Sequence, residues 1–426
     1  MIRIVKYGQT PEEEIFARVG ETRDVSATVA EIIATVRRDG DKALYAYAEK
    51  FDGAKLDALE VPREEIDGAA GRVDKKFYAV LEKAAANIRA FHAKQVRDGF
   101  EIKREDGVIL GQRVIPLDRV GIYVPGGTAA YPSTVLMDCI PAKLAGCGEI
   151  VMVTPVKGAG KVAPEILAAA KLAGVDRIFK TGGAQAVAAL AYGTESVPRV
   201  DKIVGPGNAF VAEAKRQVFG QVAIDMIAGP SEILVVADKT GDPRWIAADL
   251  LSQAEHDKLA SAVLLTDSED LAKAVANEIE IQIGRLPREE IARASIEAYG
   301  KIIVSETLDA AIEIANRLAP EHLELHLDDP FAFLPKIRHA GSVFLGKHCP
   351  EALGDYFAGP NHTLPTMGTA RFSSPLSVDD FVKKSQYLHY SKEAFGKVAQ
   401  DIACFAETEG LSAHAKSAMV RREDEA

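Results

Sequence analysis

Two side chains with metal-binding and hydrogen-bonding capacity, Gln253 and His256, lie three residues apart within the stretch 249–257. The residues before them, from Pro243 onward, have the pattern of a helix with a proline in its first turn. Residues three apart share one face of a helix, so an amide oxygen and an imidazole nitrogen would lie side by side. Such a pair can supply half of a metal site or bind a polar substrate, although Q-x-x-H alone is more typical of a polar helix end in solvent.

Two other segments combine an acid with an imidazole. Glu321 and His322 are adjacent, and histidine carries protons near neutral pH while a glutamate can activate water. A surface ion pair is the simpler explanation of that dipeptide alone. Asp355 and His362 belong to a segment rich in Gly and Pro, residues 351–366, which we expect to be a long functional loop.

A third combination lies close to the C-terminus. Glu409 and His414 flank Gly410, where we expect one helix to end before Ser412 starts the next, so both side chains can turn inward. Oxygen and nitrogen donors of these segments form a ligand set suited to zinc or a similar divalent ion. Its members are Gln253, His256, Asp355 and His414.

Four glycine-containing turns each follow an expected strand, and three of them open a helix. They occupy residues 125–127, 181–183, 205–207 and 228–230. Glycine lets a ligand approach the backbone, and a helix N-terminus attracts anions. Several such turns on one sheet edge favour a phosphate or nucleotide crevice, although any single turn needs no ligand to explain it. The dinucleotide fingerprint G-x-G-x-x-G is absent from the sequence.

Short apolar segments alternate with helical periodicities, which predicts parallel sheets covered by helices on both faces. The expected strands are 120–124, 150–153, 177–179, 202–204, 222–227, 233–236, 262–265, 302–304, 323–327 and 342–345. We predict an α/β fold with two Rossmann-like parallel-sheet domains, one inserted into the other. The expected parts are an N-terminal arm (1–24), a discontinuous catalytic domain (25–122 and 233–376), an inserted cofactor domain (123–232) and a helical C-terminal tail (377–426).

Composition limits the classes of partner. The formal charge of −11 over 426 residues argues against a nucleic-acid or anionic-membrane surface. The four cysteines are far apart and form no C-x-x-C pair, as is typical of reduced cytoplasmic thiols. The sequence has no signal-peptide pattern and no apolar run long enough to span a bilayer. We therefore expect a cytoplasmic protein without nucleic-acid or membrane partners.

Several separated segments together resemble one known family, histidinol dehydrogenase. They are GIYVPGG (121–127), GPGNAFV (205–211), AGPSE (228–232), DLLSQAEH (249–256), PEHL (320–323), GDY (354–356), NHTLPT (361–366) and LSAH (411–414). The resemblance covers nearly the whole chain. It implies an aldehyde dehydrogenase-like histidinol dehydrogenase fold. The implied reaction is the NAD-dependent oxidation of L-histidinol through L-histidinal to L-histidine, the final step of histidine biosynthesis, with two NAD and one water.

The resemblance also implies roles for individual residues. One zinc ion per subunit would be bound by Gln253, His256, Asp355 and His414. His322 would accept the protons of the alcohol and of the aldehyde hydrate, and Glu321 would activate the water. The implied substrate contacts are Ser231, His362 and Glu409, together with the four metal ligands and His322. The implied NAD contacts are Tyr123, Gln185 and Asn208.

Members of this family are homodimers with shared active sites, in which the tail supplies Glu409 and His414 to the neighbouring subunit. Because the tail of this chain is too short to bury its own core, it fits that arrangement.

Other interpretations of the residues remain. A related zinc and NAD dehydrogenase could oxidise another amino or sulfonate alcohol, and a zinc hydrolase could use Glu321 to activate water. A third interpretation is a protein that binds ligands without catalysis, and the function of such a protein would not depend on His322.

Overall fold

The computed structural model describes residues 1–18, 24–126 and 130–423. The chain divides into two compact units, Met1–Gln95 with Leu117–Phe381 and Val96–Pro116 with Val382–Ala426. Gly127 of the first expected glycine turn and residues 19–23 of the expected arm lie outside the described residues. Within the described residues, no helix combines the length and the apolar character needed to cross a membrane.

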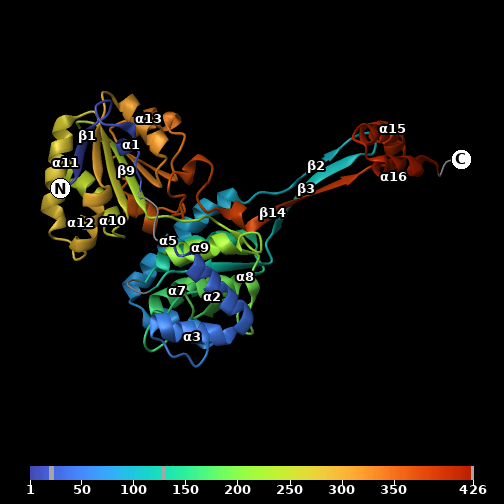
Figure 1. Ribbon diagram of the computed structural model, residues 1–426, viewed down its shortest axis with the longest axis horizontal. Helices are drawn as coiled ribbons and strands as arrows, with labels where there is room; N and C mark the ends of the chain where they lie inside the picture. Colours follow the sequence, from blue (N-terminus) through green and yellow to red (C-terminus); the bar gives the residue numbers. More distant parts are fainter. Residues whose placement is uncertain (19–23, 127–129, 424–426) are drawn as a thin grey trace. The chain divides into compact units, whose positions relative to one another are not determined.

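Five parallel strands form one sheet of the first unit, in the order β6-β5-β4-β7-β8. They belong to the part of the chain coloured teal to green in Figure 1. The strands are β4 (Arg119–Tyr123), β5 (Glu149–Val153), β6 (Arg177–Phe179), β7 (Lys202–Val204) and β8 (Ala223–Ile224). The helices that connect them are α6 (Pro132–Ala145), α7 (Pro164–Ala173), α8 (Gly183–Tyr192) and α9 (Ala209–Val218). The first strand, β4, is central, and the strand order reverses between β4 and β7. In doubly wound sheets, ligands bind outside the carboxyl ends of the strands at such a reversal.

Both faces of this sheet are buried under helices. Alternate residues of β5 point to opposite faces, with Ile150 and Met152 in one apolar cluster and Val151 and Val153 in the other. The preceding part of the chain supplies covering helices, namely α2 (Ser26–Asp39), α3 (Asp41–Asp52), α4 (Arg63–Asp67) and α5 (Lys75–His92). Residues 26–92 therefore pack on the five-stranded sheet, whereas we had grouped 25–122 with residues 233–376. Helical periodicity shows that a face is apolar but does not show which sheet it covers.

Six parallel strands form the other sheet of this unit, in the order β1-β11-β10-β9-β12-β13. They are β1 (Arg3–Lys6), β9 (Glu232–Ala237), β10 (Ser261–Thr266), β11 (Lys301–Val304), β12 (His322–His326) and β13 (Ser342–Leu345). Its helices are α1 (Glu12–Ile15), α10 (Pro243–Ala254), α11 (Glu269–Ile283), α12 (Glu289–Tyr299), α13 (Leu308–Leu318) and α14 (Glu351–Tyr356). Short 3-10 turns complete the unit: Ala69–Arg72, Ala93–Gln95, Pro330–Ala332, Leu334–Lys336, Thr369–Arg371 and Val378–Phe381.

The N-terminal strand is built into the six-stranded sheet. Arg3 of β1 lies opposite Lys301 of β11, so the short strand that we expect within the N-terminal arm (1–24) is an edge strand of this sheet. The buried ammonium of Lys301 donates hydrogen bonds to the carbonyl oxygens of Ile15 (3.0 Å) and Ala17 (2.9 Å). These bonds fasten the residues after β1 to the sheet.

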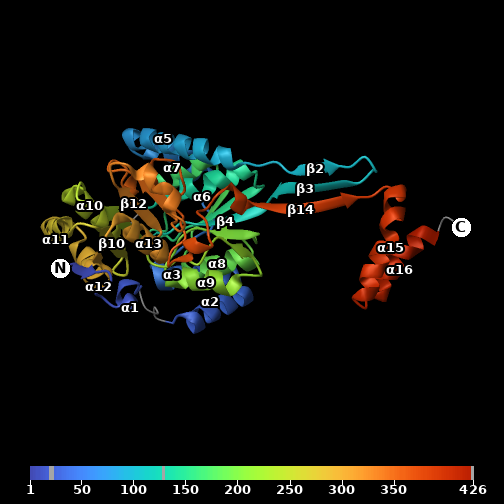
Figure 2. The same cartoon turned by 90° about the horizontal axis from the view of Figure 1, so that it is seen from above.

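The second unit is antiparallel and helical. Strand β3 (Ile109–Pro116) pairs with both β2 (Phe100–Lys103) and β14 (Val382–His389), as Figure 2 shows. Helices α15 (Lys392–Thr408) and α16 (Ser412–Glu423) follow, as expected around Gly410. Alternating residues over 100–117 around Asp106-Gly107 predict a hairpin, which β2 and β3 form, whereas β14 was not predicted. The apolar core between α15 and α16 consists of small side chains, Ala403, Ala406 and Ala415.

Candidate active site

A cavity of about 280 Å³, which we call the central cavity, is lined by residues from both sheets of the first unit. One side consists of turns after β4 and β7, and the opposite side consists of residues at the amino ends of β9 and β12. Many of the residues that we singled out from the sequence line it: Asn208, Ser231, Gln253, His256, Glu321, His322, Asp355 and His362. The fold thus brings together side chains that are scattered over more than a third of the chain.

The local sequence explains how Glu321 and His322 reach this cavity. Ala319 adopts a left-handed conformation (φ 45°) that ends α13, and Pro320 prevents the helix from continuing. His322 then begins β12, opposite Ile233 of β9. The carboxylate of Glu321 accepts a hydrogen bond from the backbone N–H of Glu232 (2.9 Å), so both side chains are anchored to the neighbouring strand.

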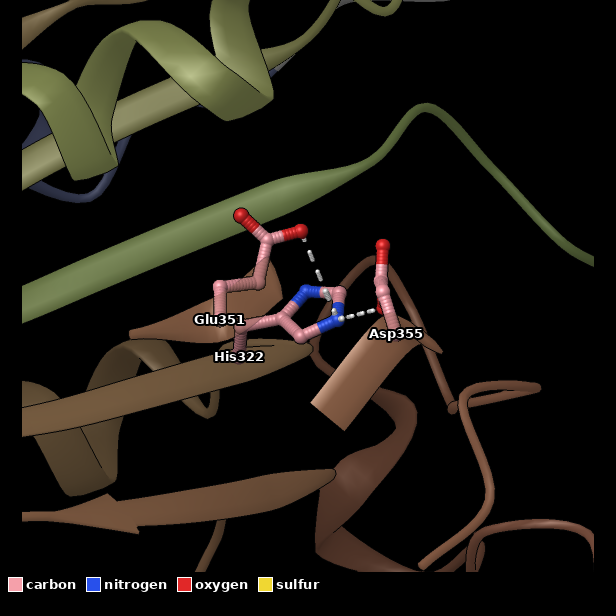
Figure 3. Close-up of side chains that lie close together, drawn as sticks. All are labelled: His322, Glu351 and Asp355. Atoms are coloured by element: carbon pink, nitrogen blue, oxygen red, sulfur yellow. Dashed lines mark ion pairs between the residues drawn. The ribbon is translucent and has the colours of Figure 1, made fainter. Parts of the chain in front are cut away.

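The imidazole of His322 has one nitrogen bound and one free. Its Nδ1 lies 3.1 Å from the carbonyl oxygen of Glu232, and because a carbonyl only accepts, Nδ1 carries the hydrogen. Within the described residues, the buried Nε2 has no hydrogen-bond partner. It lies 3.7 Å from Asp355 Oδ1 and 3.9 Å from Glu351 Oε1 (Figure 3). His322 therefore presents Nε2 to these carboxylates as its reactive atom.

Asp355 is positioned by a short helix, α14, where we had expected only a loop. The backbone N–H of Glu351 donates to Glu324 Oε1 (2.7 Å), so a buried carboxylate satisfies the start of the helix. Gly354 packs against Phe344 of β13, and a Cβ at position 354 would lie 2.6 Å from the ring. This helix directs the side chains of both Glu351 and Asp355 toward His322. Possible ligand atoms of the three residues lie within 4.8 Å of one another.

The amide of Gln253 is oriented by Glu351. Only acceptors face one end of this amide, so its nitrogen is assigned there, 2.5 and 2.9 Å from the two carboxylate oxygens of Glu351. The amide oxygen then points away from Glu351. Ser252 adds a hydrogen bond to the same carboxylate (3.0 Å). Gln253 lies in the last turn of α10, and His256 follows the helix end, with its N–H bonded to the Gln253 carbonyl (3.1 Å).

Burial controls the charge of the groups around the cavity. It lowers the pKa of both His256 and His362, which favours neutral imidazoles with a free lone pair. It also raises the pKa of Glu321 to about 8 and that of Glu351 to about 7. Burial opposes charge on His322 as well, but the negative charges of Glu321, Asp355 and Glu351 raise its pKa to about 10. This excess of carboxylates favours binding of a further cation.

Two functional acids were missed in the sequence, Glu351 and Glu324. Both are buried, and both support the residues that line the cavity. A signal for Glu324 existed, because the segment HLELH (322–326) alternates polar and apolar residues in a strand that we expected to be covered on both faces. The polar side chains of such a strand need buried partners.

The glycine turn after β7 is held from both sides. The N–H of Gly205 donates to Asp225 Oδ2 (2.8 Å), and its carbonyl accepts from Lys215 Nζ (3.0 Å). Lys215 and Asp225 form an ion pair whose side chains are 2% and 1% exposed. Next to this pair, burial raises the pKa of Asp138 to about 8, and Asp138 accepts a hydrogen bond from Thr363 Oγ1 (2.7 Å).

The expected cofactor residues occupy different environments. Asn208 lines the central cavity and caps α9 by accepting hydrogen bonds from two backbone N–H groups. Tyr123 and Gln185 are buried beside Gly183. The Tyr123 hydroxyl accepts from Gly183 N (2.9 Å), and a Cβ on Gly183 would lie 2.8 Å from Gln185 Oε1. Neither Tyr123 nor Gln185 is among the residues that line the central cavity.

Glu409 and His414 belong to the second unit. Glu409 follows α15, and His414 lies in the first turn of α16, where both side chains are exposed. Their expected contribution to an active site therefore stays a prediction.

Comparison with known proteins identifies the family to which the chain belongs. The model of the histidinol dehydrogenase family matches residues 17–422. The chain belongs to the histidinol dehydrogenase family. It is 57% identical over 423 residues to histidinol dehydrogenase of Syntrophotalea carbinolica, covering 99% of this chain and 96% of the relative. It is 54% identical to that of Clostridium acetobutylicum, covering 99% of each.

Solved structures agree with this assignment. Histidinol dehydrogenase of Elizabethkingia anophelis superimposes with a TM-score of 0.94 at 39% identity, covering 99% of this chain and 98% of that one. An acetylating aldehyde dehydrogenase of Geobacillus thermoglucosidasius gives a TM-score of 0.51 at 16% identity, covering 87% of this chain and 99% of that one, which shows likeness of fold alone. The predicted aldehyde dehydrogenase-like histidinol dehydrogenase fold is confirmed, and the protein is an oxidoreductase of this family.

Proposed function

We propose that this histidinol dehydrogenase family member oxidises L-histidinol through L-histidinal to L-histidine with NAD, the final step of histidine biosynthesis. The observation that carries the proposal is the free Nε2 of His322, which faces two carboxylates beside a cavity lined by both sheets. The alcohol and the aldehyde hydrate each lose a hydride, so the reaction consumes two NAD and one water.

Zinc is the proposed metal, one ion per subunit, with Gln253, His256, Asp355 and His414 of the partner subunit as ligands. Three properties of the site fit a divalent ion: the outward amide oxygen of Gln253, the neutral imidazole of His256 and the excess of buried carboxylate. When bound, zinc supplies a fixed positive charge that orients a nitrogen-containing substrate. Residue types and burial support this assignment.

The chain's own residues account for the proton transfers. The carboxylates around His322 raise its pKa to about 10, and a divalent cation bound among them would lower it, so that a neutral imidazole is present. Neutral His322 could then accept the hydroxyl proton at Nε2 as the carbinol hydrogen is lost as hydride, and the Nδ1 bond to the Glu232 carbonyl would fix the ring. Glu321 then accepts a proton from the water that adds to the aldehyde carbonyl, and His322 returns its proton to the carbonyl oxygen, so that His322 is neutral again. Glu321 releases its proton to solvent. His322 takes the proton of the resulting hydrate as the second hydride leaves.

Substrate and cofactor contacts complete the proposal. Ser231 and His362 line the central cavity, and His362 is oriented by a hydrogen bond from Nδ1 to the Asp355 carbonyl (3.0 Å), which leaves its Nε2 free for the substrate. Glu409 of the partner subunit is the third specific substrate contact. The proposed NAD contacts are Tyr123, Gln185 and Asn208, which are located at the glycine turns of the five-stranded sheet.

A homodimer with shared active sites is part of the proposal. The second unit supports it, because its helices enclose a core of three alanines while Phe100, Leu388 and Phe405 are 56%, 74% and 70% exposed. To test sharing, His322→Asn and His414→Asn variants are mixed under subunit exchange. Random exchange should restore about one quarter of wild-type activity, because half of the dimers are hybrids with one intact site. Self-contained sites would restore none.

The activity itself is tested with protein, zinc, NAD and L-histidinol by following NADH absorbance. We expect two NADH per histidinol and loss of turnover in His322→Asn. NADH formation only with another amino or sulfonate alcohol would indicate a different dehydrogenase, and product without NAD consumption would indicate a hydrolase.

The proposed location is the cytoplasm, which the four free cysteines support, and the net charge of −11 supports the absence of a nucleic-acid partner.

A further inference from the structure

The face of β12 that carries His322 also carries Glu324 and His326, because alternate residues of a strand point the same way. Glu324 is 4% exposed and lies between two neighbouring strands, opposite Val235 of β9 and Phe344 of β13. Burial of a carboxyl without partners is strongly unfavourable. The partners of Glu324 come from two other elements of the candidate active site.

Two hydrogen bonds connect Glu324 to helices beside β12. Its Oε1 accepts from the backbone N–H of Glu351 (2.7 Å), the first residue of α14. Its carboxyl group also forms a hydrogen bond with the side chain of Asp249 on α10. Glu324 therefore connects three elements, β12, α10 and α14, at one point.

Both helices carry a proposed metal ligand one turn beyond the residue that Glu324 contacts. Gln253 follows Asp249 by four residues on α10, and Asp355 follows Glu351 by four residues on α14. Residues four apart share one face of a helix. The two contacts of Glu324 therefore fix the helix faces that carry Gln253 and Asp355.

Helix α14 has few other means of holding its position. It consists of six residues, and helices of this length are not stable alone in water. Pro350, the residue before it, provides no side-chain cap. The carboxyl of Glu324 takes the place of that cap by accepting the first N–H of the helix.

The contact between Asp249 and Glu324 requires a shared proton, because two ionised carboxylates at hydrogen-bonding distance repel each other. In the part of the chain that the structure describes, no cation is among the groups that shift the pKa of either carboxyl. Burial raises both pKa values, that of Asp249 to about 6, and the charge of Asp249 raises the pKa of Glu324 further. Glu324 therefore holds the proton, donates to Asp249 and accepts from Glu351.

We propose that Glu324 is a positioning residue for the metal site: as a neutral acid that bridges α10 and α14, it sets the spacing between Gln253 and Asp355. Glu324 touches neither the substrate nor the reacting atoms. The inference rests on the proposed metal ligands for its zinc arm, but not for its exchange arm.

The zinc arm compares two substitutions at position 324. Glu324→Gln keeps an acceptor for the Glu351 N–H and a donor for Asp249, whereas Glu324→Met has a similar length and removes both. Zinc affinity of the metal-free protein is measured by competition with a chelator, and the ligand geometry by the absorption spectrum of the cobalt(II) form. We expect Glu324→Met to weaken zinc binding about 10–100-fold and to alter the cobalt spectrum, and Glu324→Gln to stay within about threefold of the wild type.

His326→Leu is the matched control. His326 is buried on the same face of β12, and neither of its ring nitrogens has a hydrogen-bond partner among the described residues, so its removal leaves no group unsatisfied. This variant should bind zinc as the wild type does. A loss of zinc affinity in His326→Leu equal to that in Glu324→Met would overturn the inference, as would an equal loss in Glu324→Gln.

A second variant, Asp249→Ala, removes the partner on α10 and leaves Glu324 in place. Because Asp249 is only partly buried, this variant decides the inference even if Glu324→Met does not fold. We expect zinc binding to weaken about tenfold. Wild-type zinc affinity in Asp249→Ala would overturn the inference.

The exchange arm follows hydrogen–deuterium exchange of residues 349–357 in the metal-free protein, so it does not depend on zinc. We expect the first turn of α14 to exchange about tenfold faster in Glu324→Met than in the wild type or Glu324→Gln, because the bond that anchors this turn is lost. Equal exchange in all three proteins would overturn the inference. Absence of zinc binding in the wild type would instead contradict the proposed metal site, and the exchange arm would then decide the positioning role alone.

Discussion

Replacement of Lys215 by methionine tests whether the buried ion pair beneath the turn after β7 supports both the fold and cofactor binding. Methionine keeps the length of the side chain and removes the ammonium. The change leaves the Asp225 carboxylate, 1% exposed, without its cation, and it leaves the Gly205 carbonyl without its donor. The nearby Asp138 carboxyl adds a second acid with no compensating charge.

The magnitude follows from the burial of both partners. Removal of one member of a buried ion pair costs about 3–5 kcal/mol of unfolding free energy, because the remaining charge stays buried. For a cooperative unit the size of the first unit, a loss of about 4 kcal/mol lowers the thermal midpoint by about 5 °C. The double variant Lys215→Met/Asp225→Asn should recover much of this loss, since no uncompensated charge remains.

The assay combines thermal unfolding with steady-state kinetics. Arg216→Met is the matched control, because Arg216 is the next residue of α9 and its ion pair with Glu213 is largely exposed on the arginine side, so we expect a loss below about 1 kcal/mol. At a temperature where both variants are folded, Lys215→Met should raise KM for NAD more than KM for histidinol, since Gly205 lines the central cavity. Equal destabilisation by both variants, or a double variant as unstable as Lys215→Met, would refute the reasoning.

Three other predictions concern individual side chains. Asp138→Asn should gain thermal stability over the wild type as pH rises from 5 to 8, because the folded protein holds the Asp138 proton up to a pKa of about 8 while the unfolded chain loses it near 3.8; a constant difference across that pH range would contradict this. Gln253→Ala should reduce the zinc content measured by atomic emission, whereas His322→Asn should retain it; equal zinc contents would remove Gln253 from the ligand set. His322→Gln should lower kcat by about 10²–10⁴-fold with an unchanged thermal midpoint, as expected for a proton acceptor, and a kcat near the wild-type value would exclude that role.

The central strands were predictable from sequence, and the second unit was only partly so. Strands such as β9 (Glu232–Ala237) are buried on both faces, so they appear as continuous apolar runs. Strand β14 (Val382–His389) escaped prediction because seven of its eight residues are exposed and its sequence, VKKSQYLH, shows no alternation. Its strand conformation comes from pairing with β3, which is distant in sequence.

The candidate site was also only partly predictable from the sequence. Gln253 and His256 were predictable as neighbours, because three-residue spacing at a helix end fixes their proximity. Their contact with Asp355 and His322 was suggested only through the family resemblance, because it depends on how α10, α14 and β12 meet. Glu351 was overlooked, since nothing in its local sequence indicates that α14 forms or that a carboxylate there would orient an amide on another helix.

The pairing of β1 with β11 has a consequence for synthesis of the chain on the ribosome. Arg3 is translated about 300 residues before its partner Lys301, and the whole five-stranded sheet is translated between the two. The strands and helices of that sheet can assemble as they emerge, as N-terminal regions generally do. The first strand must wait as an unpaired edge for its neighbour, and closing so long a loop is slow. Completion of the six-stranded sheet is therefore a late event, and β1 stays accessible to chaperones until β11 has been made.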